Sequence, residues 1–403
     1  MRIYINMPKL KKYQDINVYD AAISRINFAL DKCEKAYVSF SGGKDSSVML
    51  HLVMMEAIKR NRKVGVLIID LEAQYRQTIA HIEEMIEIYK DHIDLHWICQ
   101  PLLLRNAVTA YEPRWKCWDE SKKNIWVREK PKLASTANYP FAVDGLEFEE
   151  ITILFGEWYA QGRMCAGFVG IRADESLNRF RTIAIFDKEM IDEKRFTTKI
   201  ADRLYNVYPI YDWKTEDIWR FHAKHKNLPH NKIYDQMHKA GVPISQQRLC
   251  QPYGDDQRKG LWLYHILEPE TWFKLIARVN GANSGALYIQ ESGNITGYNK
   301  IAKPPGHTWE SFCNLLLLSL PKKTRDHYIK RFRSFLKGWK NRGYSKIPDE
   351  APKVLEDKQW APSYRRLCKV LLRNDHWCKG LGMTQPKSAA YQKYIEIKNK
   401  KFV

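Results

Sequence analysis

The residues best suited to chemistry lie in one short stretch of the chain, Ser-Phe-Ser-Gly-Gly-Lys-Asp-Ser at positions 39–46. Its glycines allow the backbone to approach a ligand closely, and its lysine and serines add hydrogen-bond donors. The apolar segment before it predicts a buried strand, and the segment after it predicts a helix with Asp45 or Ser46 as its cap. Because a helix N-terminus after a glycine turn favours anions, the stretch predicts a phosphate site. The residues expected to form this site are Ser39, Ser41, Gly42, Gly43, Lys44, Asp45 and Ser46.

The spacing of this stretch differs from that of two common phosphate-binding motifs. It matches neither the Walker A pattern G-x-x-x-x-G-K-S/T nor the dinucleotide pattern G-x-G-x-x-G. It resembles instead the Ser-Gly-Gly-x-Asp-Ser loop of the ATP pyrophosphatase (PP-loop) superfamily. The resemblance implies ATP as the bound nucleotide and Mg²⁺ bridging its phosphates, with Lys44 stabilising charge and Asp45 assisting the metal. The structural alternative is a glycine turn that only joins a strand to a helix.

The elements around this loop predict a parallel sheet. A second apolar run, Val64–Asp70, predicts a strand, and it is followed by a helix over about residues 74–90 and a third strand over 93–99. Continuous apolar strands that alternate with helices are typical of an α/β fold with a doubly wound, mostly parallel sheet. Ligands bind beyond the carboxyl ends of such strands, so we expect Asp70 to lie close to the loop and to contribute to the site.

A second motif follows the apolar segment 165–171. It is Gly-Ile-Arg-Ala-Asp-Glu-Ser at positions 170–176. If this strand joins the same sheet, Arg172 lies beyond its carboxyl edge, where a guanidinium can grip a phosphate and stabilise developing charge. Glu175 could orient Arg172 or help to hold a metal ion, and a surface salt-bridge cluster is the structural alternative. The site residues expected here are Gly170, Arg172, Glu175 and Ser176.

Together with a third stretch, Tyr208–Trp219, these motifs resemble the phosphoadenosine phosphosulfate (PAPS) reductase-like branch of the PP-loop superfamily. The resemblance implies an adenine nucleotide alpha hydrolase-like fold and catalytic roles for Lys44, Asp45 and Arg172. The basic C-terminal extension and the segment 249–254 are similar to an immunoglobulin-binding regulator A-type subgroup. That subgroup implies a link to gene regulation and a ParB-like protein partner.

The cysteines depart from the pattern of true sulfonucleotide reductases. The chain lacks the C-terminal Glu-Cys-Gly-x-His element, and Cys368 and Cys378 have different neighbours. For Cys250 we favour a buried structural role over a nucleophile, and a zinc site of Cys250, Cys368, His376 and Cys378 matches no standard spacing. Three functions therefore stay open: ATP-dependent adenylyl transfer with pyrophosphate release, a nucleotide-dependent regulator, and a PAPS reductase.

The charge of the chain is unevenly distributed. The formal net charge is +20, and residues 300–403 hold 24 Lys and Arg against eight Asp and Glu. A basic, aromatic-bearing module suits a nucleic acid, which we expect to contact residues 321–403, although a solvated helical surface or an acidic protein partner would also explain the charge. The tryptophans of residues 114–128 we expect in the core rather than stacked on bases.

The composition bounds the organisation of the protein. We expect a PP-loop nucleotide-binding α/β domain at residues 1–230, a helical linking region at 231–303 and a basic helical module at 304–403. Eight scattered cysteines, no signal-peptide pattern and no apolar run of membrane-spanning length favour a cytoplasmic protein without a membrane partner.

Overall fold

The computed structural model describes residues 14–108, 112–135, 138–184, 188–254, 261–279, 282, 303–320, 322–373 and 375–383. Its centre is a six-stranded sheet with the order β3-β2-β1-β6-β8-β7. All neighbouring strands are parallel except β7, which runs antiparallel to β8. The predicted mostly parallel α/β sheet is therefore confirmed. The strands are β1 (Lys35–Ser39), β2 (Val64–Ile69), β3 (Ile93–Ile98), β6 (Cys165–Val169), β7 (Thr197–Ala201) and β8 (Leu204–Val207).

Each face of the sheet has its own hydrophobic cluster, because successive strand residues point to opposite sides. On β1, Ala36 and Val38 lie in a cluster with helices from one side, whereas Tyr37 packs with Phe155 on the other side. The first cluster contains residues of α1 (Val18–Lys32), α2 (Lys44–Lys59), α3 (Arg76–Tyr89) and α6 (Thr215–Lys224). The second contains residues of α4 (Phe148–Ala160) and of the hairpin β4 (Leu102–Arg105) and β5 (Arg114–Cys117).

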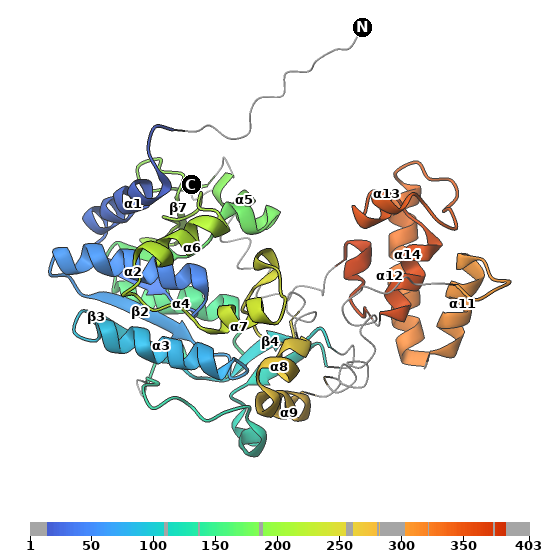
Figure 1. The fold of residues 1–403 in the computed structure, drawn as a ribbon, viewed down its shortest axis with the longest axis horizontal. Helices are drawn as coiled ribbons and strands as arrows, with labels where there is room; N and C mark the ends of the chain where they lie inside the picture. The colour runs from blue at the N-terminus through green and yellow to red at the C-terminus, as the bar shows by residue number, and fades with distance from the viewer. Residues whose placement is uncertain are drawn as a thin grey trace, which may run out of the picture.

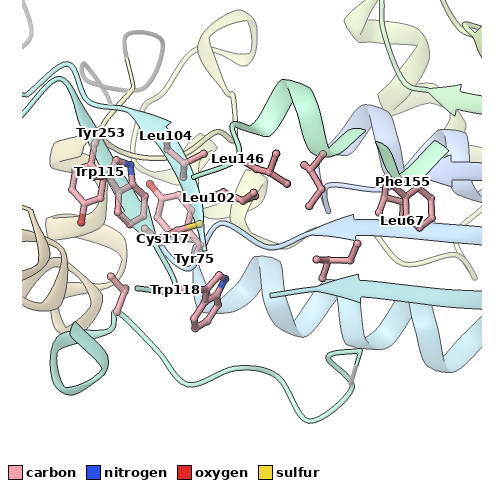
Figure 2. Packing of buried hydrophobic residues seen from close by; sticks show 14 of the residues in the cluster. Leu67, Tyr75, Leu102, Leu104, Trp115, Cys117, Trp118, Leu146, Phe155 and Tyr253 are labelled. Carbon is pink, nitrogen blue, oxygen red and sulfur yellow. The ribbon is translucent and has the colours of Figure 1, made fainter. Parts of the chain in front are cut away.

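The predicted core role of the tryptophans is confirmed. Trp115, Trp118 and Trp126 are all buried in the second cluster, and Trp118 contacts Trp126 edge to face with 5.1 Å between ring centroids. Figure 2 shows Trp115 beside Tyr253 and Tyr75, so the hairpin is packed against the segment that follows α7. These rings are not available to stack on the bases of a nucleic acid.

The start of α2 differs from the prediction. Asn17 caps α1 by accepting a hydrogen bond from the Asp20 amide at 2.9 Å. The helix after the glycine loop begins at Lys44, so Gly43 is its N-cap and the predicted cap at Asp45 or Ser46 is wrong. This difference matters because the N-cap residue is a glycine, which offers no side-chain acceptor to the first N–H groups of α2.

The segment after α6 packs into the second cluster of the α/β body. Tyr234 of α7 (Ile233–Lys239), Tyr264 of α8 (Leu261–Leu267) and Trp272 of α9 (Pro269–Arg278) are all buried there. The remaining short helices of the body are α5 (Leu177–Ala184), η1 (Glu120–Ile125), η2 (Ala173–Glu175) and η3 (Ile244–Gln246). Whether residues 231–303 form a separate linking region, and where the other boundaries fall, stay predictions.

The C-terminal helices form a group beside the α/β body with a core of their own (Figure 1). They are α11 (Trp309–Ser319), α12 (Lys322–Lys340), α13 (Lys353–Asp357) and α14 (Tyr364–Leu372), followed by η5 (Lys379–Leu381). The aromatic residues of α12 recur every three or four positions and face inward, since Tyr328, Phe332, Phe335 and Trp339 are all buried. Among the residues that the structure describes, no helix is long and apolar enough to cross a bilayer.

Candidate functional site

The glycine loop requires its glycines. Gly42 has φ +70°, a conformation that side chains rarely adopt, and a Cβ there would lie 2.9 Å from side-chain carbons of Thr78 and Ile82. The Asn231 amide fixes the same turn, because its Nδ2 donates to the Gly42 carbonyl at 2.9 Å and to Thr78 Oγ1 at 3.0 Å. The loop is thus held from α3 and from the segment that precedes α7.

The open end of α2 offers backbone donors to a ligand. The amide of Lys44 donates to Tyr234 Oη at 3.1 Å, and the amide of Ser47 donates to the Gly43 carbonyl at 2.9 Å. Within the described part of the chain, the amides of Gly42, Gly43 and Asp45 donate to no acceptor. Uncapped N–H groups at a helix N-terminus, together with the helix dipole, form a site for an anion.

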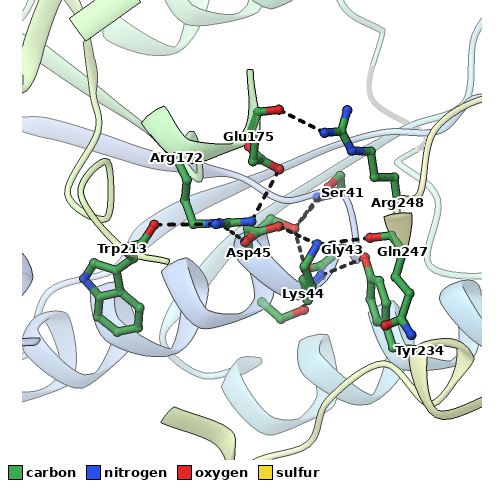
Figure 3. Close-up of polar contacts among 12 residues, drawn as sticks. Ser41, Gly43, Lys44, Asp45, Arg172, Glu175, Trp213, Tyr234, Gln247 and Arg248 are labelled. Carbon is green, nitrogen blue, oxygen red and sulfur yellow. Dashed lines mark hydrogen bonds and ion pairs between the residues drawn. The ribbon is translucent and has the colours of Figure 1, made fainter. Parts of the chain in front are cut away.

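The two predicted motifs meet at Asp45. The Arg172 Nε donates to Asp45 Oδ1 at 2.5 Å, and Lys44 Nζ lies 3.2 Å from Asp45 Oδ2 (Figure 3). Arg172 is 2% exposed, and its Nη1 lies 3.5 Å from the Trp213 carbonyl in the third motif. The first two stretches therefore meet at the Asp45 carboxylate, and the third contacts Arg172. Because Arg172 is buried, the surface salt-bridge alternative for it is wrong.

The approach of these motifs depends on Gly170. A Cβ at this position would lie 3.2 Å from backbone atoms of Asp45 and Ser46, so a larger residue would press against the start of α2. Glu175 lies further along the same loop, with Oε1 3.8 Å from Arg172 Nη2 and Oε2 paired with Arg179. Glu175 is thus in a position to orient Arg172, one of the two roles predicted for it.

Other predicted site residues have different surroundings. Asp70 ends the β2 run as expected but is fully buried, and its carboxylate accepts from Trp97 Nε1 at 2.9 Å and Arg128 Nη2 at 2.5 Å. These contacts to β3 and to the insertion, rather than to the loop, correct the expectation that Asp70 faces the phosphate site. Ser176 Oγ accepts from the Arg179 amide at 3.2 Å and so caps α5. Ser39 is the last residue of β1, and Ser41 and Ser46 join their hydroxyls at 3.0 Å inside the loop.

Residues far along the chain, which the sequence patterns did not single out, complete the site. The Gln247 carbonyl accepts from Lys44 Nζ at 3.2 Å, and Tyr234 Oη accepts from the Lys44 amide. Arg248 Nη2 donates to the Glu175 carbonyl at 2.9 Å. No spacing rule connects these positions with the loop, because about 190–200 residues separate them.

The ammonium of Lys44 lies in an unusual environment for a lysine. Burial lowers the pKa of Lys44, and the neighbouring Asp45 carboxylate opposes this change. The positive charges of Arg172 and Arg248 add to the lowering of the Lys44 pKa. Cations that converge with few carboxylates between them make a favourable place for a multiply charged anion.

A pocket of about 460 Å³ opens beside the loop, where Ser41 forms part of its wall. The end of β2, the start of α3 and the strand β4 supply most of its apolar lining, and Tyr75 and Tyr264 stack in parallel at 3.8 Å. Cys250 is exposed and lines the same pocket, so the predicted buried structural role of this cysteine is wrong. The apolar walls and the neighbouring anion site would accommodate a small molecule with a flat body and charged phosphates.

The suggested zinc ligands do not come together. Cys368 and Cys378 are buried in the core of the C-terminal helices, whereas Cys250 lines the pocket in the α/β body. Among the described residues, no group of three or more His, Cys, Asp or Glu side chains is arranged to hold a metal ion. Mg²⁺ at a nucleotide site commonly takes one or two carboxylates, phosphate oxygens and waters, and the position of Asp45 is compatible with that arrangement.

Comparison with solved structures finds likenesses of low similarity. The chain aligns with a PAPS reductase from Candida auris at 12% identity and a TM-score of 0.32, over 56% of this chain and 93% of that chain. It aligns with the FMN adenylyltransferase of Candida glabrata, in complex with FMN and the ATP analogue AMPCPP, at 14% identity and a TM-score of 0.33, over 56% and 64%. For the NMN synthetase from Francisella tularensis the identity is 15% and the TM-score 0.31, over 73% and 100%. These likenesses are too slight to bear on function.

Comparison by sequence decides the family of the chain. Residues 241–351 match DUF3440, a domain of unknown function, and residues 35–240 match the phosphoadenosine phosphosulfate reductase domain. The chain is also 41% identical over 392 residues to the uncharacterized protein YbdN of Escherichia coli (strain K12), over 96% of this chain and 95% of that protein. The reductase-domain match spans half of the chain and contains both the glycine loop and the Arg172 motif. The chain therefore belongs to the phosphoadenosine phosphosulfate reductase domain family.

Proposed function

We propose that this protein binds ATP at the glycine loop and catalyses adenylyl transfer with release of pyrophosphate. The observation that carries the proposal is the convergence of Lys44, Asp45 and Arg172 at the uncapped N-terminus of α2. Backbone donors, a helix dipole and two buried cations together match the needs of a polyphosphate. The Ser-Gly-Gly-x-Asp-Ser loop, intact in this chain, supports ATP as the nucleotide.

The pocket beside the loop is the proposed place for the nucleoside. It begins at Ser41, next to the phosphate donors, and its wall is largely apolar. The four charged residues of that wall are already paired within the protein: Glu147 with Arg114, Arg105 with Glu149, and Arg179 with Glu175. A pocket with apolar walls and internally paired charges favours an uncharged ring over a second ionic group.

The chain's own residues would act by charge stabilisation. The amides of Gly42 and Gly43 and the ammonium of Lys44 would donate to phosphate oxygens, and the guanidinium of Arg172 would neutralise charge that builds up as pyrophosphate leaves. Asp45 keeps Arg172 and Lys44 on the same side of the loop. Asp45 would also hold Mg²⁺, which would supply further positive charge to stabilise the leaving pyrophosphate.

The positions of Cys368 and Cys378 argue against a role for these two thiols in PAPS reduction. Cys368 and Cys378 are fully buried in the C-terminal core, where a thiol cannot reach a nucleotide in the α/β body without unfolding of that core. Cys250 is the thiol that lines the pocket. Sulfite release from PAPS with a reduced thiol protein, abolished in Cys250→Ala, would favour the reductase over adenylyl transfer.

The test measures pyrophosphate and AMP released from labelled ATP and Mg²⁺ by the purified chain. Lys44→Ala and Arg172→Gln should abolish release, whereas Lys90→Ala, an exposed lysine on the α/β body, should not. ATP binding is measured in parallel by calorimetry, because turnover requires the acceptor of the adenylyl group whereas binding of ATP does not. Absence of both binding and turnover in the wild-type protein would contradict the proposal.

A second candidate function is regulation through contact with nucleic acid, and one observation favours it. The face of α12 opposite its buried aromatic residues carries exposed cations, and within the described chain none of them forms an ion pair. At a rise of 1.5 Å per residue they extend over about 25 Å, a length that suits several phosphates of a nucleic-acid backbone. These cations are Lys323, Lys330, Arg333, Lys337 and Lys340.

The regulatory candidate is tested with a labelled DNA duplex at several salt concentrations. Replacing Lys330, Arg333 and Lys337 by Gln should weaken binding and reduce its salt dependence by about two to three ions. Unchanged DNA affinity in this variant would exclude α12 as the contact surface. The part of 321–403 beyond residue 383 lies outside the described residues, and the ParB-like partner and the immunoglobulin-binding regulator subgroup stay predictions from the resemblance.

A further inference from the structure

Arg248 lies beside the proposed phosphate site, but its position in the sequence is outside the reductase-domain match. That match ends at residue 240, and Arg248 lies in the region of unknown function. Its neighbour Gln247 is buried, and the Gln247 Nε2 donates to the Val242 carbonyl at 3.0 Å. Because the Gln247 carbonyl also accepts from Lys44 Nζ, the backbone at this point is fastened to the loop, and the next side chain must emerge beside it.

The guanidinium of Arg248 makes one hydrogen bond within the described chain, and its other N–H groups are available to a ligand. Its Nη2 donates to the Glu175 carbonyl at 2.9 Å, as Figure 3 shows, and this is its one hydrogen bond within the described chain. A guanidinium has five N–H donors, so four remain for a ligand. The side chain is exposed, and a ligand can therefore reach it.

The charges around the loop are unbalanced. Four cations, Lys44, Arg172, Arg179 and Arg248, surround two carboxylates, those of Asp45 and Glu175. Arg248 is close enough to Lys44 for its charge to lower the pKa of that ammonium. An excess of positive charge at a loop with free backbone donors favours a ligand with several negative charges over one with a single phosphate.

Resting on the proposed nucleotide function, we propose that Arg248 is a third phosphate-binding cation of this site and that it distinguishes a nucleoside triphosphate from a monophosphate. Lys44 and the glycine amides hold the phosphates nearest the loop. Arg248 reaches the phosphates furthest from the nucleoside through its unused N–H groups. The region of unknown function thereby contributes directly to nucleotide selection.

The experiment measures the Kd of ATP and of AMP by calorimetry for the full chain, for Arg248→Gln and for Arg248→Lys. Loss of a charge-assisted contact to phosphate should raise the Kd of ATP about 10- to 100-fold in Arg248→Gln and change that of AMP by less than about threefold. Arg248→Lys keeps the charge and should recover part of the ATP affinity. Arg220→Gln, an exposed arginine of α6, is the matched control and should change neither Kd.

Three outcomes would overturn the inference. Unchanged ATP affinity in Arg248→Gln, with affinity lost in Arg172→Gln, would remove Arg248 from the site and leave the proposed function intact. An equal loss of affinity for ATP and for AMP in Arg248→Gln would show that Arg248 only positions the segment around Gln247. This conclusion holds whether or not the melting temperature of the variant changes. No ATP binding by the wild-type protein would overturn both this inference and the proposed function.

Discussion

Arg172 and Asp45 are 127 residues apart in the sequence and are joined by a hydrogen-bonded ion pair of 2.5 Å between Nε and Oδ1. Arg172 is buried, whereas the side chain of Asp45 is 14% exposed. The pair connects the end of β6 with the first turn of α2, so the two strands that deliver the motifs must be neighbours. It therefore links the geometry of the sheet to the composition of the proposed active site.

The first prediction concerns the shape of this guanidinium. Arg172→Lys keeps the positive charge but loses the planar donors that join Asp45 and a phosphate at the same time. We expect pyrophosphate release to fall at least about tenfold, since a donor aimed at developing charge is commonly worth more than that. The rate is measured at saturating ATP. A wild-type rate would show that charge alone suffices at this position.

The second prediction concerns the contact of Gly170 with the start of α2. Gly170→Ala places a methyl group 3.2 Å from the backbone of Asp45 and Ser46, and such overpacking costs about 1–3 kcal/mol of unfolding free energy. We also expect weaker ATP binding, because the Arg172 motif must move away from the loop. Gly338→Ala is the matched control, as its Cβ would meet open space on α12 and should raise stability by up to about 1 kcal/mol. Equal effects of the two substitutions in chemical denaturation would contradict this account.

The third prediction concerns a buried ion pair that joins α9 to the end of β2. Arg278 Nε donates to Glu72 Oε1 at 2.7 Å and Nη2 to Oε2 at 3.0 Å, and both side chains are almost completely buried. Arg278→Met leaves the Glu72 carboxylate buried without its partner, which should cost about 3–5 kcal/mol. Adding Glu72→Gln should recover part of this loss in urea unfolding. Failure of the double variant to improve on Arg278→Met would indicate that packing of Arg278, rather than charge, is decisive.

The fourth prediction is a loss of stability in mild acid caused by buried histidines. Burial lowers the pKa of His51 to about 4 and the pKa values of His81 and His222 to about 3, from an ordinary 6.5. The unfolded chain therefore binds more protons than the folded one below pH 6.5, and stability that is complete above that pH falls toward pH 4. Each histidine contributes a slope of about 1.4 kcal/mol per pH unit in this window.

His222 offers the sharpest check of this pH dependence. Neither of its ring nitrogens has a hydrogen-bond partner in the described structure, so His222→Phe removes a titrating group without breaking a bond. We expect the unfolding free energy of this variant to fall less steeply between pH 6.5 and 4.5 than that of the wild type. Parallel pH profiles for the two proteins would show that His222 does not titrate on unfolding.

The sequence by itself determined the local features of this protein. The apolar runs at β1, β2, β3 and β6 and the helical patterns between the first three were sufficient to predict a parallel sheet, because period and apolar content are properties of neighbouring residues. Glycines, a lysine and serines within eight positions predicted a phosphate-binding loop for the same reason. The inward aromatic face of α12 followed from its spacing alone.

Only the tertiary structure decided which distant residues share the site. Asp70 has the right place in the chain, yet it is buried and its carboxylate accepts hydrogen bonds from Trp97 and Arg128 rather than from the loop. Conversely, Gln247 and Arg248 reach Lys44 and Glu175 through the packing of a later segment, which no local pattern encodes. The physical reason is that periodicity fixes which face of an element is buried, whereas the partner on that face depends on long-range packing and on which buried charges find each other.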